Sequence, residues 1–222
     1  MASVLAIGLP GAAAQNAVTV EAFAASEPVY RGVSEAAGRP TVGASLEWGV
    51  SSDFFVAATA QASATPAVQQ REQQLMFVGG WQKAWTDQVS LGLSLSHRAF
   101  PGSTKNWDST ELHAAIGLGR VGTIEVSYSP NYYDHETRAV AFALRANREL
   151  NRRFFVSAEA GAVEMSSERW PDYQYATLGL GLRQQQFVIE ARSSFATNEG
   201  DNLFGEPLDA PRLVLQTSYL FR

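Results

Sequence analysis

The sequence of 222 residues contains no cysteine. This absence excludes a disulfide scaffold and thiolate metal sites. The sequence also lacks an apolar run of about 18 residues, the length that a membrane-spanning helix needs. Residues 2–14 come nearest, but they are too few and include Pro10. With 17 Lys and Arg against 22 Asp and Glu, the chain lacks the basic surplus of a nucleic-acid binder, so we expect no nucleic-acid partner.

The composition is otherwise unremarkable for one domain, with 45% hydrophobic residues and a mean hydropathy of −0.12. A β-strand crosses a bilayer with only about 10 residues, of which half can be polar. An average composition is therefore compatible with a membrane barrel.

The N-terminal segment has the features of an export signal. Residues 3–9 form a short apolar core, and Ala12–Ala14 fit the small-x-small rule for signal-peptidase cleavage. No Lys or Arg precedes Arg31, so the positive start of such a signal is missing. We predict a truncated signal peptide at residues 1–14 and a single barrel domain at residues 15–222.

Alternation of apolar with small or polar residues runs through most of the chain. The clearest case is Val89–Ser96, where every odd position is apolar and every even position is Ser or Gly. Such alternation is typical of strands, because successive side chains leave opposite faces. The pattern predicts an all-β fold, a transmembrane antiparallel up-and-down β-barrel of about 12 strands. The expected strands are residues 18–31, 40–49, 53–61, 72–84, 88–99, 110–119, 123–129, 136–149, 153–164, 173–183, 186–196 and 211–222.

The connections between these strands alternate in length. Residues 32–39 make a long connection and residues 50–52 a short one, and the pattern continues with 62–71 long and 85–87 short. Outer-membrane barrels show this asymmetry, with short periplasmic turns and longer outer loops.

In each strand, the residues at alternate positions (one parity) are apolar, and those at the positions between them (the other parity) are small or charged. If the apolar parity faces lipid, the charged parity lines the lumen. The opposite assignment, with the apolar parity inward, would give a soluble barrel. The export signal, the loop asymmetry and aromatic residues near strand ends favour the membrane barrel. The predicted lumen-lining residues are Glu47, Arg98, Glu111, His113, Glu125, Arg145, Glu159, Arg183, Glu190 and Arg192.

Residues 28–40 carry a short motif, with Tyr30, Arg31, Gly32 and Ser34 followed by Pro40. This motif resembles the opening Y-x-x-R-G-x-S…P motif of the TorF-type porins, a proteobacterial family. Residues 53–57, Phe100–Gly102 and Asp172–Tyr173 resemble later family segments. The resemblance implies an outer-membrane barrel and a pore. It implies no known substrate and no catalytic residue.

Two arrangements of Tyr30 and Arg31 are open at this point. In the first, Arg31 pairs with a lumen carboxylate and holds the first loop across the mouth of the barrel. In the second, the two residues anchor a strand end at the membrane interface.

We therefore expect an outer-membrane porin for passive diffusion of small polar or charged solutes, without a cofactor or metal. Expected partners are outer-membrane lipid, lipopolysaccharide and, through the C-terminal strand, the barrel-assembly machinery. The alternatives are a non-conducting structural or loop-binding barrel, a lipid-modifying outer-membrane enzyme and a soluble barrel. An enzyme is disfavoured because His97, His113 and His135 have no evident nucleophile within reach in the sequence pattern.

Overall fold

The computed structural model describes residues 17–36, 38–63, 73–103, 107–119, 121–134, 137–167, 170–197 and 211–221. The predicted signal peptide at residues 1–14 lies outside this part of the chain. Within the described residues, no helix has the length and apolar character to cross a membrane.

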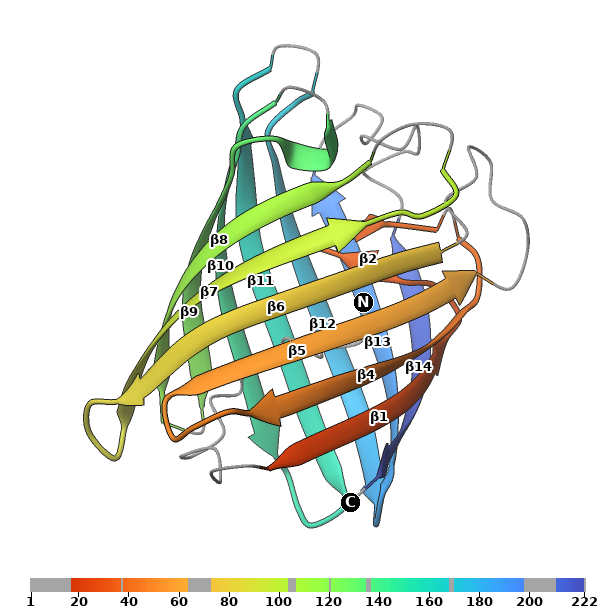
Figure 1. Cartoon of the computed structure of the whole chain (residues 1–222). Helices are drawn as coiled ribbons and strands as arrows, with labels where there is room; N and C mark the ends of the chain where they lie inside the picture. The colour runs from red at the N-terminus through yellow and green to blue at the C-terminus, as the bar shows by residue number, and fades with distance from the viewer. Residues whose placement is uncertain are drawn as a thin grey trace.

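Twelve strands of the described chain form one closed barrel, in which each strand is antiparallel to its neighbours (Figure 1). The first strand pairs with the last, as Ala22 does with Tyr219, so that the sheet has no open edge. This confirms the predicted fold class and strand number. The strands are β1 (Val18–Ala25), β4 (Thr41–Gly49), β5 (Phe54–Ser63), β6 (Gln73–Ala84), β7 (Val89–Ala99), β8 (Ser109–Leu118), β9 (Gly122–Ser129), β10 (Ala139–Glu149), β11 (Phe154–Met165), β12 (Tyr173–Gln184), β13 (Phe187–Thr197) and β14 (Arg212–Phe221).

The connections alternate as predicted, and those of one kind meet at one end of the barrel (Figure 1). The connections β4–β5, β6–β7, β8–β9, β10–β11 and β12–β13 lie at one end, which we call the short-turn end. The longer connections lie at the opposite end, which we call the long-loop end. One of them contains the 3-10 helix η3 (Tyr132–Asp134).

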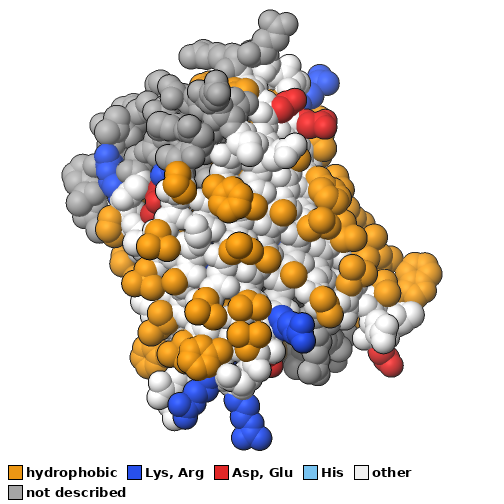
Figure 2. Space-filling model, turned by 180° about the vertical axis from the view of Figure 1, so that it is seen from behind, with side chains coloured by type: hydrophobic (Ala, Val, Ile, Leu, Met, Phe, Trp, Pro, Cys, Tyr) orange, Lys and Arg blue, Asp and Glu red, His pale blue; other side chains and the backbone are white. Residues whose placement is uncertain are grey.

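The apolar parity of the strands faces outward. In β7, Leu93 and Leu95 are about half exposed, whereas Ser94 and Ser96 between them are buried. Side chains of this kind are spread over the outer wall (Figure 2). A soluble barrel would have the reverse arrangement, because water favours polar groups outside and apolar groups inside. The soluble alternative is therefore wrong for this chain.

Aromatic side chains gather on the outside near the short-turn end. They are exposed, and all sit at or beside a strand terminus: Trp48, Phe54, Trp85, Phe154, Phe187 and Phe221. Barrels carry such belts where the hydrocarbon region meets the polar headgroups, because aromatic rings favour that boundary. The barrel therefore has both an apolar band and an interfacial belt.

The first predicted strand, residues 18–31, is too long. In the structure β1 ends at Ala25, and the chain then turns into the barrel. Pro28 has no N–H to donate to the ladder, and its carbonyl instead accepts the N–H of Glu35 at 2.9 Å. Residues 29–34, whose second half was predicted as loop, form a separate hairpin of β2 (Val29–Tyr30) and β3 (Val33–Ser34).

The outward assignment predicts that charge is penalised according to depth. Leu178, at the middle of β12, and Leu213, at the long-loop end of β14, are both exposed on the outside. Leu178→Arg should lower the free energy of unfolding from lipid vesicles by about 2–4 kcal/mol, and Leu213→Arg by about 0–1 kcal/mol. Denaturant unfolding of the refolded variants measures both values. Equal losses at the two depths would contradict the assignment.

Candidate functional site

Residues 27–36, which we call the inward hairpin, lie inside the barrel near the long-loop end (Figure 1). Residues 31–36 are all buried. The turn of the hairpin is formed by Arg31 and Gly32, whose φ angles are 50° and 79°. Positive φ is costly for a residue with a Cβ atom, so the contacts of Arg31 must compensate for its backbone conformation.

Gly32 presses the turn of the hairpin against the barrel wall. A Cβ atom at this position would lie 2.7 Å from Cβ of Tyr175 on β12 and 3.2 Å from Cβ of Ala196 on β13. Only glycine allows the two backbones to approach so closely at a positive φ. The family-motif glycine thus seats the hairpin on the β12–β13 wall.

Arg31 ties the hairpin to the other side of the barrel. Its Nη2 atom donates to Oε2 of Glu111 on β8 at 2.8 Å and to Oγ of Ser127 on β9 at 2.5 Å. The Tyr30 hydroxyl lies 3.3 Å from the same Glu111 oxygen. The side chains of Arg31 and Glu111 are only 2% and 3% exposed. Of the two arrangements considered for this motif, the structure shows the one in which Arg31 pairs with an inward-facing carboxylate.

Glu35 makes a second connection, at the end of β3. Its Oε1 atom accepts hydrogen bonds from Nη1 of Arg98 at 2.9 Å and from the Tyr133 hydroxyl at 2.6 Å. Arg98 also donates to the Tyr133 hydroxyl. Burial raises the pKa of the Tyr133 hydroxyl, which therefore stays protonated and donates to Glu35.

A third connection joins the start of the hairpin to the closing strand. Nη1 of Arg212 on β14 donates to Oε1 of Glu27 at 2.6 Å. Next to it, the Ser26 N–H donates to the Leu215 carbonyl at 2.8 Å. The inward hairpin is therefore held by three ion pairs that reach β7, β8 and β14.

A chain of polar contacts extends along the inward faces of β7 to β11. Ser96 Oγ lies 2.9 Å from His113 Nε2, and His113 Nδ1 lies 3.3 Å from Glu125 Oε1. Nη1 of Arg145 donates to Glu125 Oε2 at 2.8 Å, and its Nε lies 3.3 Å from Glu159 Oε1. Pairing of this kind offsets the cost of placing charges away from water.

The contact between Ser96 and His113 corrects the expectation that no nucleophile lies within reach of a histidine. Ser96 and His113 sit diagonally on neighbouring strands, since Ser96 is opposite Glu111 in the ladder. The order serine, imidazole, carboxylate is that of a hydrolase triad. Here, however, Glu125 is shared with Arg145, and all three members are buried among ion pairs. We interpret the group as part of the polar network. His135 lies outside the described residues.

The predicted lumen residues fall into two groups. Eight take part in buried or half-buried polar contacts: Arg98, Glu111, His113, Glu125, Arg145, Glu159 and the pair Glu190–Arg192, whose atoms approach to 2.9 Å. Glu47 is half-buried and lies near the short-turn end of β4. Arg183 is at the short-turn end, where it pairs with Glu149 at 3.1 Å and is 46% exposed. The motif residues Ser34 and Pro40 are buried and exposed, respectively.

An apolar cluster fills part of the interior near the long-loop end. Its members come from the hairpin, the loops and the inward faces of β10 to β13: Val33, Phe100, Trp107, Tyr132, Tyr133, Ala139, Ala141, Val163, Tyr173, Tyr175 and Ala196. The cluster supports the hairpin from one side. It also narrows the space left inside the barrel.

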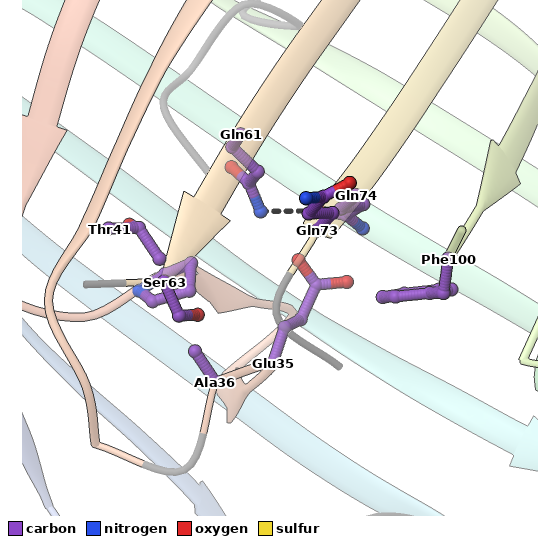
Figure 3. Close-up of a pocket in the computed structure, with 9 residues that line it drawn as sticks. Glu35, Ala36, Thr41, Gln61, Ser63, Gln73, Gln74 and Phe100 are labelled. Carbon is purple, nitrogen blue, oxygen red and sulfur yellow. Dashed lines mark hydrogen bonds between the residues drawn. The ribbon is translucent and has the colours of Figure 1, made fainter. Parts of the chain in front are cut away.

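In the part of the chain that the structure describes, two cavities flank the inward hairpin. The larger, of about 40 Å³, lies between the hairpin and β11 to β14. The smaller, of about 10 Å³, lies between the hairpin and β4 to β6 (Figure 3). In the smaller one Glu35 and Ala36 face Thr41, Ser63 and the hydrogen-bonded pair Gln61–Gln74. Polar walls of this kind suit water.

Sequence reasoning missed several residues of this site, namely Glu27, Glu35, Ser96, Tyr133 and Arg212. Glu27 precedes the motif and Glu35 lies within it, so a carboxylate on each side of Tyr30 and Arg31 was a usable signal. Tyr133 lies in a connection, and its contact spans 98 residues of sequence. Nothing local in the sequence indicates such a contact.

The closed twelve-strand barrel, apolar outside and polar inside, is the fold of outer-membrane porins. The chain belongs to the family described as "Bacterial protein of unknown function (Gcw_chp)", whose model matches residues 10–203. No match was found among curated proteins.

Several solved barrels share this fold at low sequence identity. The NanC porin has a TM-score of 0.63 at 7% identity, covering 91% of this chain and 99% of its own. The KdgM porin has a TM-score of 0.59 at 7% identity, covering 92% and 99%. The COG4313 outer membrane channel from Pseudomonas putida F1 has a TM-score of 0.52 at 10% identity, covering 95% and 97%. At these identities the likeness concerns the fold alone.

The Arg31–Glu111 pair predicts a large coupling energy. Removing one partner leaves a buried charge unpaired, so Arg31→Gln or Glu111→Gln alone should cost about 3–5 kcal/mol of unfolding free energy. The double variant should cost less than the sum of the two. Arg183→Gln, in an exposed pair, should cost at most about 1 kcal/mol. A double-mutant cycle by denaturant unfolding tests this, and additive losses would contradict the pairing.

Proposed function

We propose that this protein is an outer-membrane channel through which small polar solutes diffuse passively. The observation that carries the proposal is the reversal of the usual polarity, with leucine and valine outside and serine, glutamate and arginine inside. A barrel in lipid needs the apolar exterior, and a polar interior is useful when water or solute occupies it.

The inward hairpin sets the size of what can pass. Its three ion pairs hold it across the barrel, and the larger space beside it is about 40 Å³. This space holds about three water molecules. We therefore expect a narrow channel of low conductance. The paired charges of the interior also give local fields that act on small solutes.

Further support comes from the resemblance of residues 28–40 to the TorF-type porins, and from the porin names of the similar barrels. For partners, we propose membrane lipid and lipopolysaccharide around the apolar band. We also propose that the assembly machinery recognises β14, where Tyr219 stacks edge-on with Phe187 and Phe221 at 4.8 Å.

Planar-bilayer recording of the refolded protein tests the channel. Discrete current steps are the expected result. A correctly folded protein, shown by heat-dependent mobility on detergent gels, that gives no steps would favour a non-conducting structural barrel instead.

Two glycine substitutions test how the hairpin affects the current. Gly32→Ala places a Cβ atom 2.7 Å from Tyr175, so it should dislodge the hairpin and increase single-channel conductance. Gly38→Ala meets nothing within 4 Å, although its φ of 72° imposes a similar backbone strain. It should leave the conductance near that of the unmodified protein. Equal conductance for both variants would show that the hairpin does not limit the current.

A further inference from the structure

The space around the inward hairpin is divided unequally. Toward β7 to β9 it is filled, because two guanidinium groups pack against the Tyr30 ring. The Arg31 guanidinium lies 4.6 Å from the ring centre and that of Arg98 lies 4.4 Å from it. These guanidinium groups are themselves paired with Glu111 and Glu35. This side of the hairpin is closed by packed charges and an aromatic ring.

Toward β4 to β6 the space is only about 10 Å³, close to the volume for one water molecule. Phe100 and Pro28 form part of its lining, and the Gln61–Gln74 hydrogen bond bridges β5 and β6 there (Figure 3).

Toward β11 to β14 the space is about four times larger, at about 40 Å³. The hairpin contributes Glu27, Val29, Arg31 and Gly32 to this lining, and the wall contributes Glu159, Thr177, Arg192, Ser194, Val214 and Gln216. Gly32 contacts the wall between β12 and β13, so the space is bounded by the hairpin turn and the strands that it touches.

We propose that solutes cross the barrel through one asymmetric route, the gap between the inward hairpin and β11 to β14. The proposal rests on the proposed channel function and names the path within it. The inner wall of β7 to β9 holds the hairpin in place, and the wall of β11 to β14 supplies the groups that solutes meet.

The lining of this route also indicates the class of solute. Its charges are compensated: Glu27 by Arg212 at 2.6 Å, Glu159 by Arg145 at 3.3 Å, and Arg192 by Glu190 at 2.9 Å. Thr177 and Ser194 add hydroxyls, which bond each other at 2.8 Å. A charge-balanced wall with hydroxyl and amide groups suits small uncharged polar solutes, and it should pass small ions of both signs.

Cysteine accessibility tests the route cleanly, since the natural chain has no cysteine. Thr177→Cys places a thiol in the proposed route. Ser96→Cys places a thiol on the closed side, beside Glu111, its partner in the ladder. The probes are methanethiosulfonate ethylammonium and methanethiosulfonate ethylsulfonate. The thiolate attacks the sulfenyl sulfur, forms a disulfide and releases methanesulfinate.

In bilayer recordings both probes should reduce the current of Thr177→Cys stepwise, and dithiothreitol should restore it. The current of Ser96→Cys and of the unmodified protein should not change. The reversal potential of the unmodified channel in a potassium chloride gradient should be near zero. Arg192→Cys, at a lining position whose side chain is 15% exposed, serves as a second route position if Thr177→Cys does not refold.

Three results would overturn the proposed route while leaving the channel intact. These are block at Ser96→Cys, absence of block at both route positions despite labelling shown by mass spectrometry, and strong selectivity for ions of one sign. Absence of any current from the folded, unmodified protein would instead overturn the channel function, and the route with it.

Discussion

The pairing of charges inside the barrel is the constraint on which the rest of the structure depends. The inward hairpin brings Glu27, Arg31 and Glu35 into a space with little room for water. Each would be costly there alone, because a buried charge without a partner loses its hydration. The wall supplies Arg212, Glu111 and Arg98 at 2.6, 2.8 and 2.9 Å. Because these partners sit on three separate strands, the three ion pairs together fix where the hairpin lies.

This placement explains why the interior is uneven. The arginine side of the hairpin turns toward β7 to β9, where ion pairs and the Tyr30 ring occupy the space. The glycine side turns toward β12 and β13, where the absence of a Cβ atom allows close approach but leaves a cavity beside it. The interior therefore has packed charges on one side of the hairpin and a cavity of about 40 Å³ on the other.

Much of the barrel could be predicted from the sequence, because a period of two reports directly which face a side chain occupies. Eleven of the twelve barrel strands begin and end within about 3 residues of the expected positions. The exception is β1. Val29 and Tyr30 are residue types that favour strands, so the local sequence does not reveal that the chain leaves the wall and pairs with itself there.

The site was less predictable, because contacts across strands depend on register. A shift of one residue moves a side chain to the other face of the sheet. The sequence of a single strand does not determine its register with the neighbouring strands. Arg31 and Glu111 were each identified as candidates, but their meeting requires the whole ladder between them. Ser96 and His113 are diagonal neighbours, which only the β7–β8 register reveals. Tyr133 reaches Glu35 from a connection without any periodic pattern.

The central claim is that the interior is a polar path narrowed by the inward hairpin. Swelling of liposomes in sugars of increasing size measures this most directly, with the natural protein compared with a variant in which residues 27–36 are replaced by a short glycine–serine linker. The account predicts that the natural protein admits only the smallest solutes and that the linker variant admits larger ones. If both proteins, correctly folded, admit the same solutes or none, the account is wrong.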